Sequence, residues 1–285
     1  MKRLYKHNIT ASFLLWLDHE ILKEGEAFTN TSSDFFPVNN NYQGIFTYGL
    51  PYKQTVSDTS IANADILSGV TVNGTFTIPG SGDLIDVNYE HGLAFFSSDQ
   101  AGNTLNGEYA VKEINVSNAE DKAEEDLLFE TKFELRPEIS QNPTGLAPND
   151  LTVPHIFIKN AGSSNKEWAF GGKEQTTTNI RAIVLADSAF MIDAVESICV
   201  DTRGKHICLL EPEDMPLNPY GGWLSGVAYN YDGVVASKAN SENVYVEEVF
   251  VSKLSSLGED LKEVNPHVVA AFIDFEITHE RTPRV

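Results

Sequence analysis

The sequence predicts a β-rich α+β fold: an N-terminal helix, then an antiparallel β-domain, then an α+β unit with a strand–helix–strand core. Asn, Thr, Ser and Gly are abundant along the 285 residues, which favours many strands and turns over long helices. Helical periodicity is clearest near the start of the chain and again after residue 187. Apolar residues make up 41% of the chain, which is enough for a sizeable buried core.

Residues 8–24 are predicted to form an amphipathic helix. Its apolar residues recur at helical spacing and share one face, and they are Phe13, Leu14, Leu17 and Ile21. Asn8 or Thr10 is a suitable N-cap, and Gly25 is a natural end. Trp16 lies on the flank of the apolar face. Such a helix either packs on its own domain or docks on a neighbouring molecule, and the sequence leaves both open.

Residues 26–55 are predicted to form a long connection. The segment carries many aromatic residues among Asn, Thr, Ser and Gly, and they are Phe28, Phe35, Phe36, Tyr42, Phe46, Tyr48 and Tyr52. Because aromatic side chains need burial, the segment is not expected to be disordered. We expect an extended arm that lies across a surface, either its own or a partner's, since such a composition is common at interfaces.

Strands and tight turns are predicted between residues 56 and 135. Asn73-Gly74 separates two alternating apolar segments between Val70 and Ile78, which is the strongest short signal for a hairpin. The remaining predicted features here are a strand–turn–strand at 84–96, a turn at Asn106-Gly107, and strands at 108–116 and 129–135.

Pro137–Pro154 is the clearest linker candidate, because it combines several prolines and a glycine with polar residues. We therefore place a domain boundary there. The predicted division is an N-terminal helix (1–28), a β-rich domain (29–136), a linker (137–154) and an α+β domain (155–285).

The α+β domain is predicted from a strand, a helix and a second strand that follow one another closely. Residues 178–186 are rich in β-branched residues, and Asp187 is expected to cap a helix that ends at Val200. The other predicted elements are strands at 155–159 and 205–210, a Pro- and Gly-rich loop at 211–226, a strand pair at 227–236 split by Asp232-Gly233, strands at 244–251 and 267–278, and a short helix at 255–263.

The charge and the cysteine content restrict the possible partners. The formal net charge is −21, and an acidic surface repels phosphate, so we expect no specific binding of nucleic acid. Cys199 and Cys208 fit buried thiols in a reducing cytoplasm better than an extracellular disulfide framework. No secretory signal and no apolar segment of about 20 residues is visible, so we expect no membrane association.

No catalytic, cofactor-binding or metal-binding residue is predicted. Ser81 lies in a Gly-Ser-Gly-Asp sequence that matches no serine-nucleophile signature, and Ser188 lacks the flanking glycines of a nucleophile elbow. His206 and Cys208 are two residues apart on a predicted strand, but two ligands do not make a zinc site. We therefore expect a protein without a cofactor that is not an enzyme. A carboxylate-dependent hydrolase stays an alternative, because the two carboxylates of such an enzyme meet only in the fold.

Two segments carry a resemblance to a known class of proteins. Thr176–Leu210 (TTTNIRAIVLADSAFMIDAVESICVDTRGKHICLL) resembles the strand–helix–strand of neck and tail-terminator proteins of tailed bacteriophages. Leu84–Phe96 (LIDVNYEHGLAFF) is similar to hairpins of phage neck and tail components, and an opening helix followed by a β-domain also looks like that class. The extra β-rich part at about 35–135 departs from the pattern of a minimal tail terminator.

The resemblance implies a structural virion protein that is assembled in the host cytoplasm. It implies a homo-oligomeric ring at the portal–tail junction, in contact with other neck or tail proteins of the virion and without catalysis or a cofactor. The candidate interface residues lie on the N-terminal helix, on the aromatic arm and in the loop at 211–226, and they are Phe13, Trp16, Leu17, Phe35, Phe36, Tyr42, Tyr48, Tyr220 and Trp223.

A carbohydrate-binding β-sandwich module is the second alternative. In that case three exposed aromatic residues would stack on sugar rings, and they are Trp168, Tyr220 and Trp223. Long loops are usually functional or bound to a partner. A protein with two long aromatic loops, at 26–55 and 211–226, and no catalytic motif fits an assembly component whose loops become ordered against its neighbours.

Overall fold

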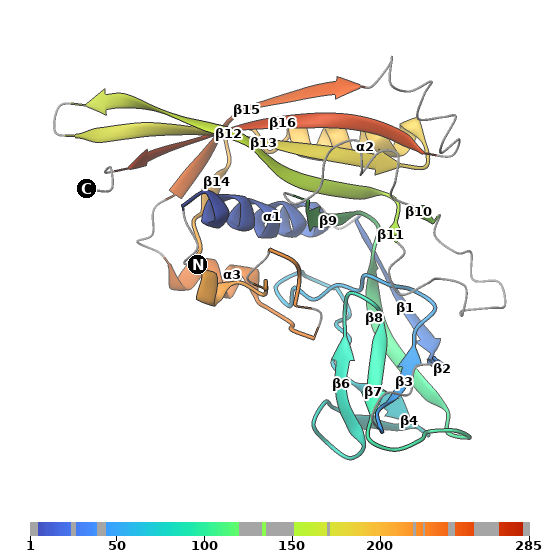
Figure 1. The fold of residues 1–285 in the computed structure, drawn as a ribbon. Helices are drawn as coiled ribbons and strands as arrows, with labels where there is room; N and C mark the ends of the chain where they lie inside the picture. The colour runs from blue at the N-terminus through green and yellow to red at the C-terminus, as the bar shows by residue number, and fades with distance from the viewer. Residues whose placement is uncertain are drawn as a thin grey trace.

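A computed structural model describes most of the chain (Figure 1). The described residues are 5–23, 27–38, 44–119, 133–134, 151–169, 172–218, 221–224, 226–238, 243–253 and 268–281. The protein has an α+β fold rich in strands, in which an N-terminal helix is followed by antiparallel sheets and a curled mixed sheet, as the sequence predicts. Within the described ranges, none of the helices combines the length and the apolar character that crossing a bilayer requires.

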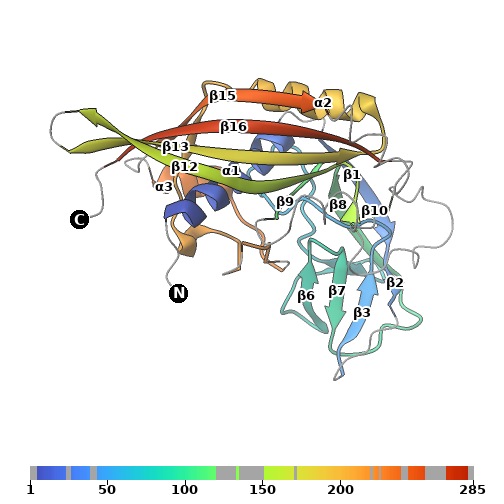
Figure 2. The same cartoon turned by 45° about the horizontal axis from the view of Figure 1, so that its top comes forward.

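A six-stranded sheet forms the larger part of the protein, which we call the body. Its strand order is β14 (His206–Cys208), β15 (Asn243–Lys253), β16 (Val269–Arg281), β13 (Lys173–Ala186), β12 (His155–Ala169) and β9 (Asn115–Asn118). Every pair of neighbours is antiparallel except β12 and β9, which are parallel. Figure 2 shows the β12–β13 hairpin extending past the end of α1 (Tyr5–Lys23), away from the rest of the body.

Helix α1 lies against one face of this sheet, and α2 (Ala189–Val200) packs into the same core cluster. Phe13, Leu14 and Leu17 are completely buried, and the ring centroid of Phe13 lies 4.8 Å from that of Phe275 on β16. Alternate residues of β13 complete the core, because they share one face of the strand. The predicted helix at 8–24 is therefore confirmed. Of the two possibilities that the sequence leaves open, the structure shows the helix packed on its own domain.

The second part of the protein is a small β-sandwich made of two four-stranded sheets. The first has the order β1 (Phe28–Asp34), β8 (Leu105–Lys112), β4 (Val70–Val72) and β5 (Thr75–Thr77). The second has the order β2 (Phe36–Pro37), β3 (Phe46–Gly49), β7 (Leu93–Phe96) and β6 (Leu84–Asn88). Tyr109, Phe96 and Leu67 are among the fully buried side chains of the core between the sheets.

Two of the predicted hairpins are present in the sandwich. Asn73 and Gly74, with φ angles of 49° and 83°, connect β4 to β5, and these positive values are what a two-residue hairpin turn requires. The predicted strand–turn–strand at 84–96 is the β6–β7 pair. The prediction of an arm at 26–55 was wrong, because this segment supplies β1, β2 and β3, and strand pairing satisfies its backbone.

The predicted turn at Asn106-Gly107 was also wrong, because both residues lie within β8. Gly107 is required there by packing. A Cβ atom at this position would lie 2.8 Å from Cε2 of Phe35 and 3.2 Å from Cδ1 of Leu67, which are both buried in the sandwich core. The glycine therefore permits a close approach between β8 and the side chains packed over it.

Gly107→Ala is expected to lower the free energy of unfolding by about 1–3 kcal/mol, because the added methyl group overpacks the sandwich core. Urea unfolding followed by circular dichroism measures the change. The matched control is Glu108→Ala, at the exposed neighbour on the same strand, for which we expect a change within about 0.5 kcal/mol. Equal effects of the two variants would contradict the packing role of Gly107.

In the second half of the chain, the structure differs from the prediction at the start of two helices. Helix α2 has Ser188 as its N-cap, whose side chain accepts a hydrogen bond from the Met191 amide, whereas Asp187 was predicted. The strand pair predicted at 227–236 is wrong, because helix α3 (Tyr231–Ser237) occupies most of it. The Asn230 side chain accepts the Gly233 amide at 2.7 Å, so the Asp-Gly pair lies in the first turn of a capped helix.

The remaining elements are short. They are the 3-10 helix η2 (Pro212–Asp214) and the parallel pair of β10 (Phe133–Glu134) and β11 (Leu151–Thr152). The predicted helix at 255–263 and all but 151–154 of the predicted linker lie outside the described residues.

Candidate functional site

A buried ion pair lies where the end of α1 meets the sandwich. The Lys112 Nζ atom on β8 donates to both carboxylate oxygens of Asp18 on α1, at 2.7 and 2.8 Å. Both side chains are less than a tenth exposed. Burial raises the pKa of Asp18, and the neighbouring Lys112 ammonium opposes this rise. The pair therefore joins the body to the sandwich at a largely buried position.

A second buried pair lies next to the first. His19 Nδ1 and Asp58 Oδ2 are 2.8 Å apart, and neither side chain is appreciably exposed. Asp58 Oδ1 also accepts hydrogen bonds from the Ser60 hydroxyl at 2.6 Å and from the Tyr231 amide at 3.2 Å. Burial by itself raises the pKa of Asp58, but the hydrogen bonds from His19 and Ser60 outweigh it, so this pKa lies below its ordinary value.

Tyr229 and Tyr231 close the junction from the C-terminal half of the chain. The Tyr229 hydroxyl donates to Asp18 Oδ2 at 3.4 Å, and burial raises its pKa well above the ordinary value. The ring of Tyr231 stacks on His19 with 4.5 Å between the ring centroids. Four segments that are distant in the sequence thus meet here, and their polar groups satisfy one another. We call Asp18, His19, Asp58, Lys112 and Tyr229 the junction network.

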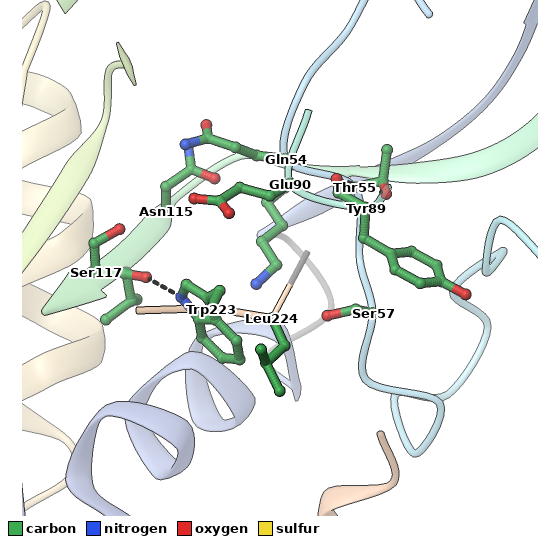
Figure 3. Close-up of a pocket in the computed structure, with 11 residues that line it drawn as sticks. Gln54, Thr55, Ser57, Tyr89, Glu90, Asn115, Ser117, Trp223 and Leu224 are labelled. Atoms are coloured by element: carbon green, nitrogen blue, oxygen red, sulfur yellow. Dashed lines mark hydrogen bonds between the residues drawn. The ribbon is translucent and has the colours of Figure 1, made fainter. Parts of the chain in front are cut away.

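A small, open pocket lies against the junction network, with Lys112 in its lining (Figure 3). Its lining includes Gln54, Glu90, Asn115, Ser117 and Trp223, which come from both the sandwich and the body. The Trp223 Nε1 atom donates to the Val116 carbonyl oxygen at 2.9 Å, and this hydrogen bond is drawn in Figure 3.

Trp223 is held by interactions within the chain. The Lys112 ammonium lies 5.0 Å from the centroid of the indole ring, and the ring of Tyr229 lies 5.9 Å from it. The polar atom of the indole is therefore already used, while part of the side chain lines the pocket.

The predicted interface residues lie in different environments. The residues of the first group are enclosed in the core of the body or of the sandwich, and they are Phe13, Trp16, Leu17, Phe35 and Tyr48. Phe13, Trp16 and Leu17 are therefore used in packing α1 on the body, and Phe35 and Tyr48 are used in the sandwich. Phe36 is exposed, Trp223 is partly buried, and Tyr42 and Tyr220 lie outside the described residues.

The residues considered above as nucleophiles or metal ligands do not form a common site either. Ser81 lies in the turn before β6, where its amide donates to the Ile78 carbonyl oxygen, and Ser188 caps α2. His206 is on the exposed side of β14, and Cys208 is buried. In the part of the chain that the structure describes, no three side chains of the metal-ligating types are grouped as a metal site requires.

Several exposed aromatic side chains lie at separate places on the body. Phe190 at the start of α2 is 83% exposed, Phe250 and Tyr245 on β15 are 56% and 39% exposed, and Trp168 near the tip of the β12–β13 hairpin is 52% exposed. Tyr245 and Phe250 share one face of β15, whereas Trp168 and Phe190 lie at opposite ends of the sheet. Aromatic residues are enriched at protein interfaces, so these residues are candidates for contacts with a partner.

The six-stranded sheet also has two open strand edges among the described residues. On one side, β9 pairs with β12 only along His155–Ile158, and no described segment pairs with the outer side of Ser163–Ala169, which we call the β12 edge. On the other side, β14 pairs with β15 only along Asn243–Tyr245. No described strand pairs with the outer side of Glu248–Lys253, which we call the β15 edge.

Comparison with known proteins gives no further guide to this site. No family model matches the chain, and no curated protein sequence matches it.

Proposed function

We propose that the chain is a structural virion protein of a tailed bacteriophage, placed at the neck or tail. In this proposal it assembles into a homo-oligomeric ring and binds other virion proteins. The observation that carries it is the exposure of four aromatic side chains on the body, Trp168, Phe190, Tyr245 and Phe250. Aromatic residues are enriched at protein interfaces, and these four lie on β12, α2 and β15.

The distribution of buried polar groups supports the same proposal. The charged residues of the junction network pair with one another and hold the sandwich to the body, as expected for a rigid structural subunit. The net charge of −21 also fits, because an acidic surface near a DNA channel repels phosphate and lets DNA pass without adhering.

The experiment is a light-scattering measurement over a concentration series, followed by negative-stain imaging of the largest species. We expect a mass that is a multiple of the 31.4 kDa of one chain, and closed rings in the images. A mass of one chain at every concentration, together with the absence of the protein from purified virions of its phage, would contradict the proposal.

A pair of matched variants tests whether the exposed aromatic residues of the body form the contact between copies. Phe250→Ser is expected to weaken association about 10- to 30-fold, as for an aromatic residue at the centre of an interface. Phe76→Ser is the control, because Phe76 is 57% exposed, close to the 56% of Phe250, but lies on β5 of the sandwich. If the two variants associate equally strongly, the exposed aromatic residues of the body do not form the contact between copies.

A further inference from the structure

We propose that the six-stranded sheet continues from one copy of this chain into the next, through antiparallel pairing of the β12 edge of one copy with the β15 edge of its neighbour. This inference rests on the proposed function, because it specifies the contact between the copies. It commits to a second copy of this chain as the occupant of both edges.

The directions of the strands allow this pairing. Three antiparallel steps separate the two edges, from β12 to β13, from β13 to β16, and from β16 to β15. Strands β12 and β15 therefore run in opposite directions, and a second copy that is added in the same orientation presents its β15 antiparallel to β12 of the first. The registers place Glu248 level with Gly162 and Lys253 level with Ile156, so the two edges lie at opposite ends of the sheet and the second copy is also shifted along the strands.

Each edge begins where the hydrogen bonds and strand pairing with its own chain end. On β12, the Asn160 side chain accepts the Gly162 amide at 3.0 Å, and its Nδ2 atom contacts the Thr10 hydroxyl at 3.4 Å. A register shift follows at Gly162, which has a φ of 138°. Bulges end strand pairing and re-aim a strand, so the chain beyond Gly162 is directed away from α1.

The β15 edge has the same property. The backbone of Val246 pairs with Gly204 and Lys205, and the Glu247 carbonyl oxygen accepts a hydrogen bond from Arg203 Nε at 3.3 Å. A register shift between Val246 and Glu248 separates this covered part from the edge that follows. Natural proteins usually blunt such edges, because an open strand is a template for pairing with another chain.

The chemistry of the two segments is also compatible with pairing. The β12 edge carries Lys166 and Trp168, both exposed, and the β15 edge carries Glu248 and Phe250. In antiparallel pairing, the register that places Lys166 opposite Phe250 places Trp168 opposite Glu248, so Trp168 and Phe250 are diagonal neighbours, which is within reach of aromatic side chains. Each edge has one lysine and one glutamate in its sequence, so neither edge has a net charge that would repel the other.

The resulting contact joins two different surfaces of the same chain, so it is heterologous. Contacts of this type produce closed rings when the rotation between copies closes, and open filaments when it does not. The twist of the sheet supplies a rotation at every joint. Edge pairing therefore gives a physical basis for a ring, and it predicts that neither edge forms the contact alone.

The test uses disulfide cross-linking between engineered cysteines, since both natural cysteines are buried. Ser164→Cys and Lys166→Cys place a thiol on the β12 edge, and Ser252→Cys places one on the β15 edge, all at exposed positions. Chains that carry one cysteine on each edge should form a ladder of dimers, trimers and larger species under mild oxidation. A mixture of two single-cysteine chains, one for each edge, should stop at the dimer.

The control replaces Ser252→Cys with Ser97→Cys, at an exposed position on the sandwich, and we expect no ladder. Assembly by light scattering without a ladder from either double variant would overturn edge pairing and leave the proposed function standing. Dimers from a single β12-edge cysteine alone would overturn it too, because they indicate pairing of two like edges. Absence of both assembly and cross-links would contradict the inference and the proposed function together.

Discussion

Lys112→Met is expected to lower the free energy of unfolding by about 3–5 kcal/mol, because it leaves the Asp18 carboxylate buried without its counter-charge. The cost arises from an uncompensated charge in a place of low dielectric constant, and it does not require any change in the volume of the core. Urea unfolding at neutral pH measures it.

The double variant Lys112→Met with Asp18→Asn is the control for this prediction. It removes both charges, so it should recover a large part of the stability that the single variant loses. If the two single variants cost little and their effects simply add, Lys112 and Asp18 are not coupled and the description of the junction network is wrong.

Asp58→Asn is expected to cost about 2–3 kcal/mol at neutral pH, because a charged acceptor of hydrogen bonds from His19, Ser60 and Tyr231 is replaced by a neutral amide. The pKa of Asp58 is lowered in the folded state, so its contribution to stability is fully present above its unfolded pKa of about 3.9. The contribution is lost as the pH falls through the lower, folded pKa.

The pH dependence gives this prediction its specific readout. Between pH 5 and pH 3, the stability of the natural protein should fall more steeply than that of Asp58→Asn, so the difference between the two shrinks as the solution becomes acidic. Asp83→Asn is the matched control, since Asp83 is an exposed carboxylate on the sandwich. If the difference in stability between the natural protein and Asp58→Asn does not change with pH, the charge of Asp58 does not contribute to stability.

The elements that were predicted correctly are those whose signal is local. The apolar spacing of Phe13, Leu17 and Ile21 identifies α1, and all three side chains are buried in the structure. Asn73-Gly74 identifies the β4–β5 hairpin, because few residues other than Asn and Gly accept the positive φ angles found there.

The failures have tertiary causes. Asn106-Gly107 carries the same local signal as Asn73-Gly74, but Gly107 is present because Phe35 and Leu67 pack over it. Asp232-Gly233 also suggests a turn, but the Asn230 cap and the partly buried Val234 and Val235 favour a helix at that position. A short sequence motif does not distinguish these cases, since the deciding contacts come from distant segments.

The junction network and the two edges were not predictable for the same reason. Lys112 is separated from Asp18 by 94 positions and Tyr229 by 211, so their proximity exists only in the fold. The one local feature that indicates this network is Asp18-His19 within an apolar helical segment, because charged residues in such a segment need buried partners. Whether a strand is central or at an edge depends on the order of strands in the sheet, and β12 gives no such sign in its sequence.

The most direct test of the account is a cryo-EM reconstruction of the assembled protein at a resolution that separates strands. We expect a closed ring in which the β12 edge of each copy lies next to the β15 edge of the following copy, in antiparallel pairing. A reconstruction in which these edges face solvent, or a sample that contains only single chains of 31.4 kDa, would contradict it.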